Sequence, residues 1–131
     1  MVPIPRVNNE VRHIDRNRRN SYLASSMARI ISEESHEPRL ALDVGAGEGE
    51  VARRVAELSN VRFFGIEPRA RNESAVRSGV LIRRACAVDI PFDSDTSDVA
   101  MMISVYEHIL PDRRHKSLME IKRVLRPGAY S

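Results

Sequence analysis

The sequence has little cysteine, little glycine and no long hydrophobic run. Cys86 is the only cysteine among 131 residues, so the chain cannot form an internal disulfide. No apolar run approaches the ~20 residues that a membrane-spanning helix needs, and the amino-terminal segment has no apolar core of a secretory leader. No pair of histidine or cysteine residues has the spacing of metal ligands. We therefore expect no membrane partner, no metal and a cytoplasmic location.

The positive charge is confined to one end of the chain. The net charge of +3 comes from residues 1–20, which contain five arginines and only two acids, Glu10 and Asp15. Residues 21–131 carry equal numbers of basic and acidic side chains. Such an arm could contact phosphates, but no aromatic residues are interleaved for base stacking, which favours a solvated leader. We divide the chain into a basic arm at residues 1–20 and one globular domain at residues 21–131.

Short apolar runs alternate with amphipathic segments. Residues 1–15, which include Pro3 and Pro5, are expected to be irregular, and the apolar spacing at residues 21–34 predicts a helix. Strands are predicted at residues 40–44, 61–66, 80–88 and 99–105, and helices at residues 51–58, 68–78 and 112–125. Pro68 would open the second of these three helices, Asp112 would cap the last, and Pro127-Gly128 would stop it. This alternation predicts an α/β fold with a parallel sheet and helices on both faces.

The stretch LALDVGAGEGE at residues 40–50 holds three of the six glycines, Gly45, Gly47 and Gly49. It spans the end of a predicted strand and the start of a predicted helix. Glycines permit positive φ and allow the backbone to touch a ligand, and the following helix offers free N–H groups at its positive end. The stretch therefore predicts a ligand site at the carboxyl end of the first strand.

The spacing of these glycines disfavours a dinucleotide, whose fingerprint reads G-x-G-x-x-G. Counted from Gly45, the sixth position is Glu50; counted from Gly47, it is Ala52, an allowed replacement, but the third glycine of the turn then breaks the usual pattern. The carboxylates of Glu48 and Glu50 are also poor neighbours for a pyrophosphate, whereas they are tolerable beside a ligand of zero or positive charge. An NAD-dependent dehydrogenase is therefore disfavoured.

Four segments, taken in order, resemble class I S-adenosylmethionine-dependent methyltransferases, in particular their type 11 domain. "LDVGAGEG" resembles motif I with its D/E-x-G-x-G-x-G core, and "FFGIEP" resembles the second strand with its terminal acid. "DIPFDSDTSDVAMMISVYEHI" resembles the third-motif loop and fourth strand, and "LMEIKRVLRPGA" resembles the helix and turn before the fifth strand. The match covers about residues 40–129. Each motif alone is weak, but four in this order are specific.

The resemblance implies a Rossmann-like parallel sheet of order 3-2-1-4 with flanking helices, lacking the family's strands 5–7. Residues 21–131 would then be a partial domain that binds S-adenosyl-L-methionine and releases S-adenosyl-L-homocysteine. We expect a truncated chain whose fourth strand has an open apolar edge at residues 101–103. A partner chain or a second copy of this chain would cover that edge.

The resemblance also implies roles for individual residues. Asp43 would stabilise the methionine end of the cofactor, and the backbone of Gly45, Ala46 and Gly47 would line it. Glu67 would accept hydrogen bonds from both ribose hydroxyls, because two carboxylate oxygens can meet two adjacent hydroxyls. The weaker alternatives are a capping or loop-bracing role for Asp43 and a solvent-exposed strand-end acid at Glu67.

The adenine end departs from the family pattern. Family members often have an acid four residues before the Leu or Ile of an L-P-F element, and counting back from Ile90 gives Cys86, whose thiol is a poor acceptor. Two alternatives follow: backbone groups of Ala87 and Val88, with Asp89 nearby, and packing hold the base, or affinity for the cofactor is reduced. We interpret Cys86 as a small packed side chain rather than a nucleophile.

The segment SVYEH, residues 104–108, follows the fourth strand where the family approaches the methyl group and the substrate. Ser104 would contact the cofactor. His108 could be a general base for O- or N-methylation, because histidine titrates near neutral pH, or it could orient the loop. Methyl transfer needs little more than in-line alignment of the nucleophile and the methyl group, so proximity could account for most of the catalysis.

The sequence thus supports the hypothesis of methyl transfer to a small-molecule acceptor. The alternative is a non-catalytic cofactor-binding remnant or scaffold completed by a partner chain, which Cys86 and the missing strands suggest. A nucleic-acid methyltransferase is disfavoured, because SVYE at residues 104–107 stands where amino-methylating enzymes read N/D-P-P-Y/F. The acceptor and the methylated atom stay open.

Overall fold

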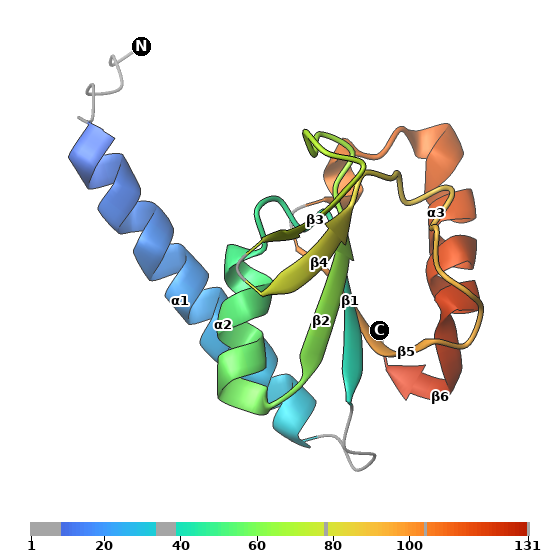
Figure 1. The fold of residues 1–131 in the computed structure, drawn as a ribbon, viewed down its shortest axis with the longest axis horizontal. Coiled ribbons are helices and arrows are strands. Elements are labelled where there is room, and N and C mark those ends of the chain that lie inside the picture. The colour runs from blue at the N-terminus through green and yellow to red at the C-terminus, as the bar shows by residue number, and fades with distance from the viewer. Residues whose placement is uncertain (1–8, 34–38, 78, 104, 131) are drawn as a thin grey trace.

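The computed structural model describes residues 9–33, 39–77, 79–103 and 105–130. It has three layers, with a six-stranded sheet between two layers of helix (Figure 1). Helices α1 (Asn9–Glu33) and α2 (Glu50–Ser59) pack together on one face of the sheet, and α3 (Pro111–Val124) covers the other face. None of the helices in the described part of the chain is long and apolar enough to cross a bilayer.

The sheet contains strands β1 (Leu40–Val44), β2 (Arg62–Ile66), β3 (Ser74–Arg77), β4 (Val80–Arg83), β5 (Ser97–Met102) and β6 (Leu125–Tyr130). Their order is β3-β4-β2-β1-β5-β6, and every neighbouring pair is parallel except β3 with β4. The predicted order 3-2-1-4 is confirmed as β4-β2-β1-β5. Because β1 is central, its carboxyl end meets those of β2 and β5 at one edge of the sheet, where open α/β sheets bind ligands.

The helix predicted at residues 68–78 is wrong, because this segment turns and then forms β3. Its sequence, PRARNESAVRS, has no apolar stripe at helical spacing, so a helix there would bury no face. The strand predicted at residues 80–88 ends early, at Arg83. The Arg83 guanidinium lies 6.0 Å from the centre of the Phe92 ring and donates to the Pro91 carbonyl at 3.2 Å, which fixes the loop after β4.

The prediction of an open edge beside the fourth strand is also wrong. The last helix ends at Val124, and β6 follows it directly and pairs in parallel with β5. Pro127-Gly128, expected only to stop the helix, lies within β6, where a proline is tolerated because β6 is an edge strand. The reason for placing a partner chain or a second copy on the β5 edge is thereby removed.

Two helix starts differ from the predictions. Helix α1 begins at Asn9, so the irregular segment expected at residues 1–15 is wrong for residues 9–15. The same helix crosses residue 20, where we divided the basic arm from the domain, and that division stays a prediction. Helix α3 begins with Pro111 directly after Leu110, so Asp112 lies in the first turn instead of capping it.

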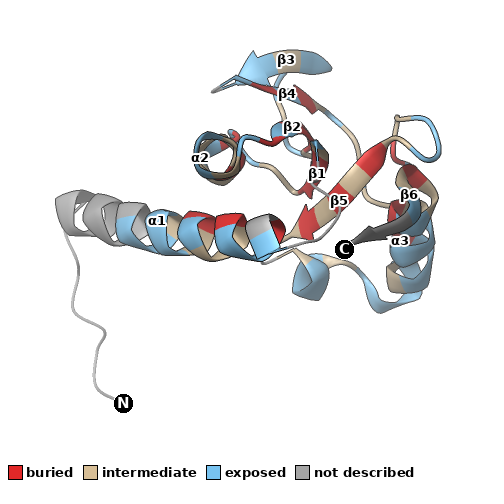
Figure 2. Ribbon diagram, turned by 90° about the horizontal axis from the view of Figure 1, so that it is seen from below, coloured by how far each residue is buried: buried red, intermediate tan, exposed pale blue. Residues whose placement is uncertain are grey.

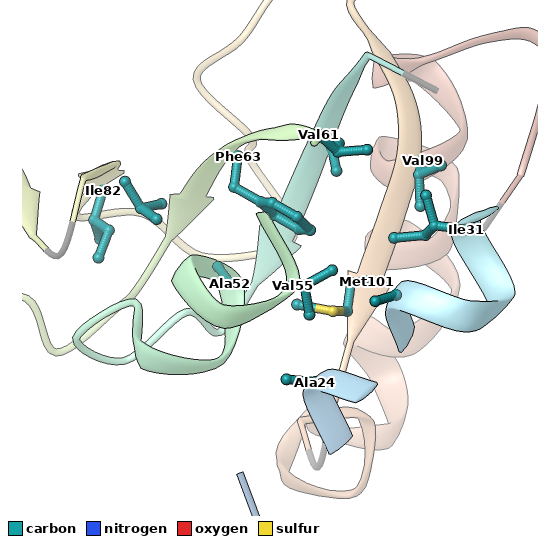
Figure 3. Packing of buried hydrophobic residues seen from close by; sticks show 12 residues of the cluster. Ala24, Ile31, Ala52, Val55, Val61, Phe63, Ile82, Val99 and Met101 are labelled. Atoms are coloured by element: carbon teal, nitrogen blue, oxygen red, sulfur yellow. The ribbon is translucent and has the colours of Figure 1, made fainter. Parts of the chain in front are cut away.

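Buried apolar side chains form a core on each face of the sheet, and buried segments alternate with exposed ones along the helices and strands (Figure 2). The cluster against α1 and α2 includes Ala24, Ile31, Val55, Phe63 and Met101 (Figure 3). The cluster against α3 includes Leu42, Val44, Phe64, Ile66 and Ile121. Full burial of one large aliphatic or Phe side chain contributes about 1.5–3 kcal/mol, so these clusters dominate the stability of the fold.

A hydrogen-bond cluster on α3 fixes the loop between β4 and β5. Arg123 donates to the Glu120 carboxylate at 2.8 and 3.1 Å, to the Ile90 carbonyl at 2.8 Å, to the Phe92 carbonyl at 3.0 Å and to Ser94 Oγ at 3.2 Å. Glu120 also accepts the Ile90 N–H at 2.9 Å. These bonds, Arg123 first and Ile90 second, hold the pKa of Glu120 below its usual value.

Asp98 joins the start of β1 to the start of β5. One carboxylate oxygen accepts the backbone N–H groups of Arg39 at 2.9 Å and Leu40 at 3.0 Å, and the other pairs with Arg126 at 3.2 Å. The Asp98 side chain is 22% exposed. If its carboxylate were removed, water would therefore only partly satisfy the N–H groups of Arg39 and Leu40.

We expect Asp98→Ala to lower the free energy of unfolding by about 1–3 kcal/mol, because two backbone N–H groups lose their charged acceptor. Urea denaturation followed by circular dichroism measures this change. Glu57→Ala is the matched control, since it breaks only the surface pair with Arg53 at 2.9 Å, which is worth at most ~0.5 kcal/mol. Equal losses in the two variants would contradict the role given to Asp98.

Candidate functional site

The turn between β1 and α2 is bonded to the carboxyl end of β2. Gly45, Gly47 and Gly49 have φ of 78, 58 and 83°, in the left-handed region that favours glycine. The N–H groups of Gly45 and Ala46 both donate to the Ile66 carbonyl at 2.9 Å. Of the predicted lining residues, Gly45 and Ala46 therefore already use their backbone N–H groups in hydrogen bonds inside the protein.

Glycines allow this turn to approach its neighbours closely. A Cβ on Gly65, in β2, would lie 2.6 Å from the Ala46 Cβ and 3.2 Å from the Asp43 carbonyl oxygen. A Cβ on Gly45 would overlap the Val105 side chain, whereas one on Gly47 would meet nothing within 4 Å. Gly65 and Gly45 are thus required by packing inside the protein, and Gly47 opens onto free space beside the turn.

The Glu67 carboxylate lies next to the glycine turn, as the sequence predicts for two parts of one site. Its Oε1 accepts the Gly47 N–H at 3.2 Å, and its Oε2 accepts the Arg69 N–H at 3.0 Å. A carboxylate offers about four lone-pair positions, so about two stay available for further hydrogen bonds. Glu67 is half-buried, which leaves these positions accessible to a ligand.

Asp43, near the end of β1, is buried, with 5% of its surface exposed. Burial, and secondarily the negative charge of Glu67, raises the pKa of its carboxyl group to about 7. Asp43 lines a cavity of about 170 Å³ together with Gly45 and Ala46, and Arg19, Asn20 and Leu23 of α1 line the same cavity. The amino-terminal helix therefore forms part of the candidate site, a contribution that the sequence did not reveal.

A second cavity, of about 300 Å³, brings together several predicted residues from distant parts of the chain. Gly45, Cys86, Ala87, Val88 and His108 all line it. Other residues that line it were not predicted: Ile66, Pro68, Val105, Ile109, Leu110 and Arg113. Cys86 is exposed, so its interpretation as a packed side chain is wrong. Ser104, also predicted to contact the cofactor, lies outside the described residues.

His108 lies at the mouth of this cavity. It ends the 3₁₀ turn η1 (Tyr106–His108), and its backbone N–H donates to the Val105 carbonyl at 2.9 Å. The side chain is 79% exposed, and its Nε2 lies 3.9 Å from a Glu107 carboxylate oxygen. The imidazole is thus free to meet a bound molecule from the solvent side. Val105 was missed because its contact with Gly45 joins distant parts of the chain and leaves no local pattern in the sequence.

A third cavity, of about 480 Å³, lies where Glu67 meets the glycine turn. It is lined by Gly47, Glu48 and Glu67 and by three arginines, Arg69, Arg71 and Arg77. Arg69 also lines the cavity that contains His108, so the two cavities are neighbours. The sequence placed these arginines on a helix, and only the observed turn and β3 bring them together.

The sequence matches the family described as "Methyltransferase domain" over residues 42–131. It is 38% identical over 97 residues to the O-methyltransferase resE of Aspergillus sclerotiorum, covering 67% of this chain and 36% of that protein. It is 32% identical over 96 residues to the 27-O-demethylrifamycin SV methyltransferase of Amycolatopsis mediterranei, covering 66% of this chain and 35% of that protein. The chain thus spans little more than a third of the length of these relatives.

Solved structures share the fold. The Burkholderia thailandensis 1,6-didemethyltoxoflavin-N1-methyltransferase, solved with 1,6-didemethyltoxoflavin and S-adenosylhomocysteine bound, aligns with a TM-score of 0.65 and 18% identity, covering 96% of this chain and 63% of that one. The YcgJ protein of Bacillus subtilis aligns with a TM-score of 0.63 and 21% identity, covering 80% of this chain and 46% of that one. At these identities the likeness shows the fold alone.

We expect Asp43→Asn to change how stability depends on pH. The folded protein keeps the Asp43 proton up to about pH 7, whereas an unfolded aspartate loses it near pH ~4. The wild type therefore loses stability as pH rises between these two values, at about 1.4 kcal/mol per pH unit, and the asparagine variant lacks this loss. Urea denaturation across this pH window measures the difference, and parallel curves for the two proteins would contradict it.

Proposed function

The chain belongs to the class I S-adenosylmethionine-dependent methyltransferases, and from that premise we propose that it binds the cofactor over the carboxyl ends of β1 and β2 and serves methyl transfer to a small-molecule acceptor. One observation carries this proposal. The Glu67 carboxylate and the Gly47 N–H are joined at 3.2 Å, beside a turn whose glycine opens onto free space. A carboxylate held in this way, with lone pairs left, suits the two adjacent hydroxyls of a ribose.

Asp43 would meet the methionine end of the cofactor in the cavity of about 170 Å³. The ammonium group of that end would favour the ionised carboxyl, because a nearby positive charge lowers the pKa of an acid. Since burial raises the pKa of Asp43 to about 7 in the free protein, binding at neutral pH would release a proton. Arg19 and Asn20 of α1, which line the same cavity, would face the carboxylate of the methionine end.

The adenine would enter the cavity of about 300 Å³, where Ile66 and Pro68 offer apolar surface and the segment that contains Ala87 and Val88 lines the same space. Cys86 lines the cavity too, but a thiol is a weak acceptor, so packing and backbone groups would hold the base.

The bound cofactor supplies a methyl group made electrophilic by its sulfonium. The chain's own contribution would be to align the acceptor with that methyl group and exclude water, which can account for much of the rate. His108, at the mouth of the cavity that Gly45 also lines, would accept the proton of an acceptor hydroxyl. Three of the relatives are named as O-methyltransferases or as a 27-O-demethylrifamycin SV methyltransferase, which supports a hydroxyl acceptor.

A cofactor-binding module without turnover is the second candidate. The observation that favours it is the 79% exposure of the His108 side chain, because a general base works best when the reacting proton is shielded from water. This module would retain the contacts of Asp43, Gly47 and Glu67, which do not involve His108.

We expect the chain to bind S-adenosylhomocysteine and Gly47→Ala to weaken that binding at least ~10-fold, or ~1.4 kcal/mol. A methyl group on Gly47 would enter the free space where the ribose is proposed to lie. Gly79→Ala is the matched control, since Gly79 has φ of 76° and a Cβ there also meets nothing within 4 Å. Both variants carry the same cost of placing a Cβ at positive φ, about 1–2 kcal/mol. A difference between their affinities for S-adenosylhomocysteine therefore reflects contact with the ligand. Isothermal titration calorimetry measures it, and no heat from folded wild type would refute the proposal.

We expect His108→Gln to lower kcat about 10²-fold on a hydroxylated acceptor, and to flatten the acid side of the pH–rate profile. Affinity for S-adenosylhomocysteine should not change, because no proposed cofactor contact is lost. The assay follows S-adenosylhomocysteine production over a panel of small phenols and alcohols. If wild type binds the cofactor but turns over none of them, the module without turnover is favoured; if the variant keeps full kcat, His108 is not the base.

A further inference from the structure

We propose that the free edge of β3 pairs with the same strand of a second copy of this chain, so that two sheets join across a two-fold axis. This interface is independent of the proposed function, because it uses neither the cofactor nor the acceptor. Strand β3 lies at one end of the sheet and is mostly exposed (Figure 2). Many edge strands avoid such pairing through prolines or bulges, whereas β3 has no proline and pairs with β4 without a shift in register.

The outer side of β3 offers backbone groups to a further strand. The N–H of Arg84 donates to the Glu73 carbonyl at 2.9 Å, which extends the antiparallel pairing of β3 with β4 by one residue. In an antiparallel pair, residues that bond to the neighbouring strand alternate with residues that do not. Every second residue from Glu73 therefore bonds toward β4, and the N–H and C=O groups of Ser74 and Val76 point away from it. Within the described ranges, neither of these two residues has a backbone hydrogen bond to a turn or loop.

One antiparallel register satisfies both the backbone and the charges. When Ser74 of one copy lies opposite Val76 of the other, the two residues exchange both N–H···O bonds, and the two-fold axis repeats this pair. The same register places Glu73 of each copy opposite Arg77 of the other. A shift by one residue would set outward groups against groups already bonded to β4. A shift by two residues, in either direction, would place Ala75 opposite Glu73 or Arg77, and the charge pairs would be lost.

Glu73 and Arg77 are available for these contacts. Both are exposed, and no ion pair in the described part of the chain joins either of them to another side chain. Opposite charges directly across a sheet attract each other, whereas like charges in that position are destabilising. One acid and one base placed symmetrically about Ala75 make this edge complementary to itself. This symmetry favours a second copy of the chain over an unrelated peptide.

Exposed apolar surface reaches the same edge. Val76 is 69% exposed, and Leu81, directly opposite it in β4, is 40% exposed. In the proposed register, the Val76 side chains of the two copies lie diagonally across the axis, so pairing covers part of this surface. One short strand from each copy buries less area than a standard interface, so we expect a weak and reversible dimer.

The test is sedimentation velocity of the whole chain over a range of concentrations. We expect a monomer–dimer equilibrium with a dissociation constant on the order of 100 µM. Glu73→Arg and Arg77→Glu should each weaken dimerisation at least ~10-fold, because each sets like charges opposite one another at both ends of the paired strands. An equimolar mixture of the two variants should restore the affinity of the wild type, since each new charge then meets its opposite on the other variant.

Arg62→Glu is the matched control, because it makes the same change of charge at an exposed residue at the start of β2. This variant should dimerise like the wild type, and it should not restore the affinity of Glu73→Arg when the two are mixed. Val76→Pro should weaken dimerisation at least ~10-fold, because it removes an outward N–H that takes no part in the pairing with β4. Far-ultraviolet circular dichroism checks that each variant keeps the fold.

Three outcomes would overturn the proposal. A chain that stays monomeric up to ~1 mM, the limit of even weak specific association, would mean that the shortness of β3 and its arginine only protect the edge from pairing. A dimer that none of the substitutions in β3 weakens would use another face of the molecule. Charge variants that weaken the dimer singly but do not recover when mixed would exclude the register in which Glu73 faces Arg77.

Discussion

The candidate site depends on the close contact between the glycine turn and the end of β2. Two N–H groups, of Gly45 and Ala46, share one acceptor, the Ile66 carbonyl, and this geometry requires that Gly65 carry no Cβ. Once the turn is held there, Glu67 is within hydrogen-bond reach of the third glycine-turn donor, and Asp43 is buried behind it. Hydrogen bonds between the glycine turn and the end of β2 thus set the relative positions of the turn and Glu67.

Acidic and basic side chains occupy different positions around this turn. The two acids at the ends of β1 and β2, Asp43 and Glu67, suit the cationic and hydroxyl-bearing parts of a nucleoside cofactor. Beyond Glu67 the sign reverses, because Arg69 and Arg71 follow it within one short loop. Glu67 and these arginines line the same cavity, so a molecule bound beside the turn would meet charges of both signs.

The sequence predicted the parts whose signal is local. Buried strands at residues 40–44 and 61–66, the glycine turn and the acid after the second strand all follow from short patterns, and the four central strands have the predicted order. The errors arose where tertiary pairing decides. β3 forms only because β4 offers it an edge, and β6 pairs with β5 although Pro127-Gly128 reads locally as a stop. The α1 side of the cavity at Asp43 was missed because apolar spacing predicts that a helix packs on the domain but not which residues of the sheet it packs beside.

Helix α3 links two regions that are otherwise far apart in the chain. Through Arg123 and Glu120 it binds the loop between β4 and β5, and through Arg113 and Ser117 it lines the cavity that contains His108. The backbone of that loop and the wall of the cavity are therefore parts of one rigid unit. Natural variation that widens or narrows the cavity by tilting this helix should be accompanied by compensating changes at residues 90–94, so the two segments are expected to evolve together.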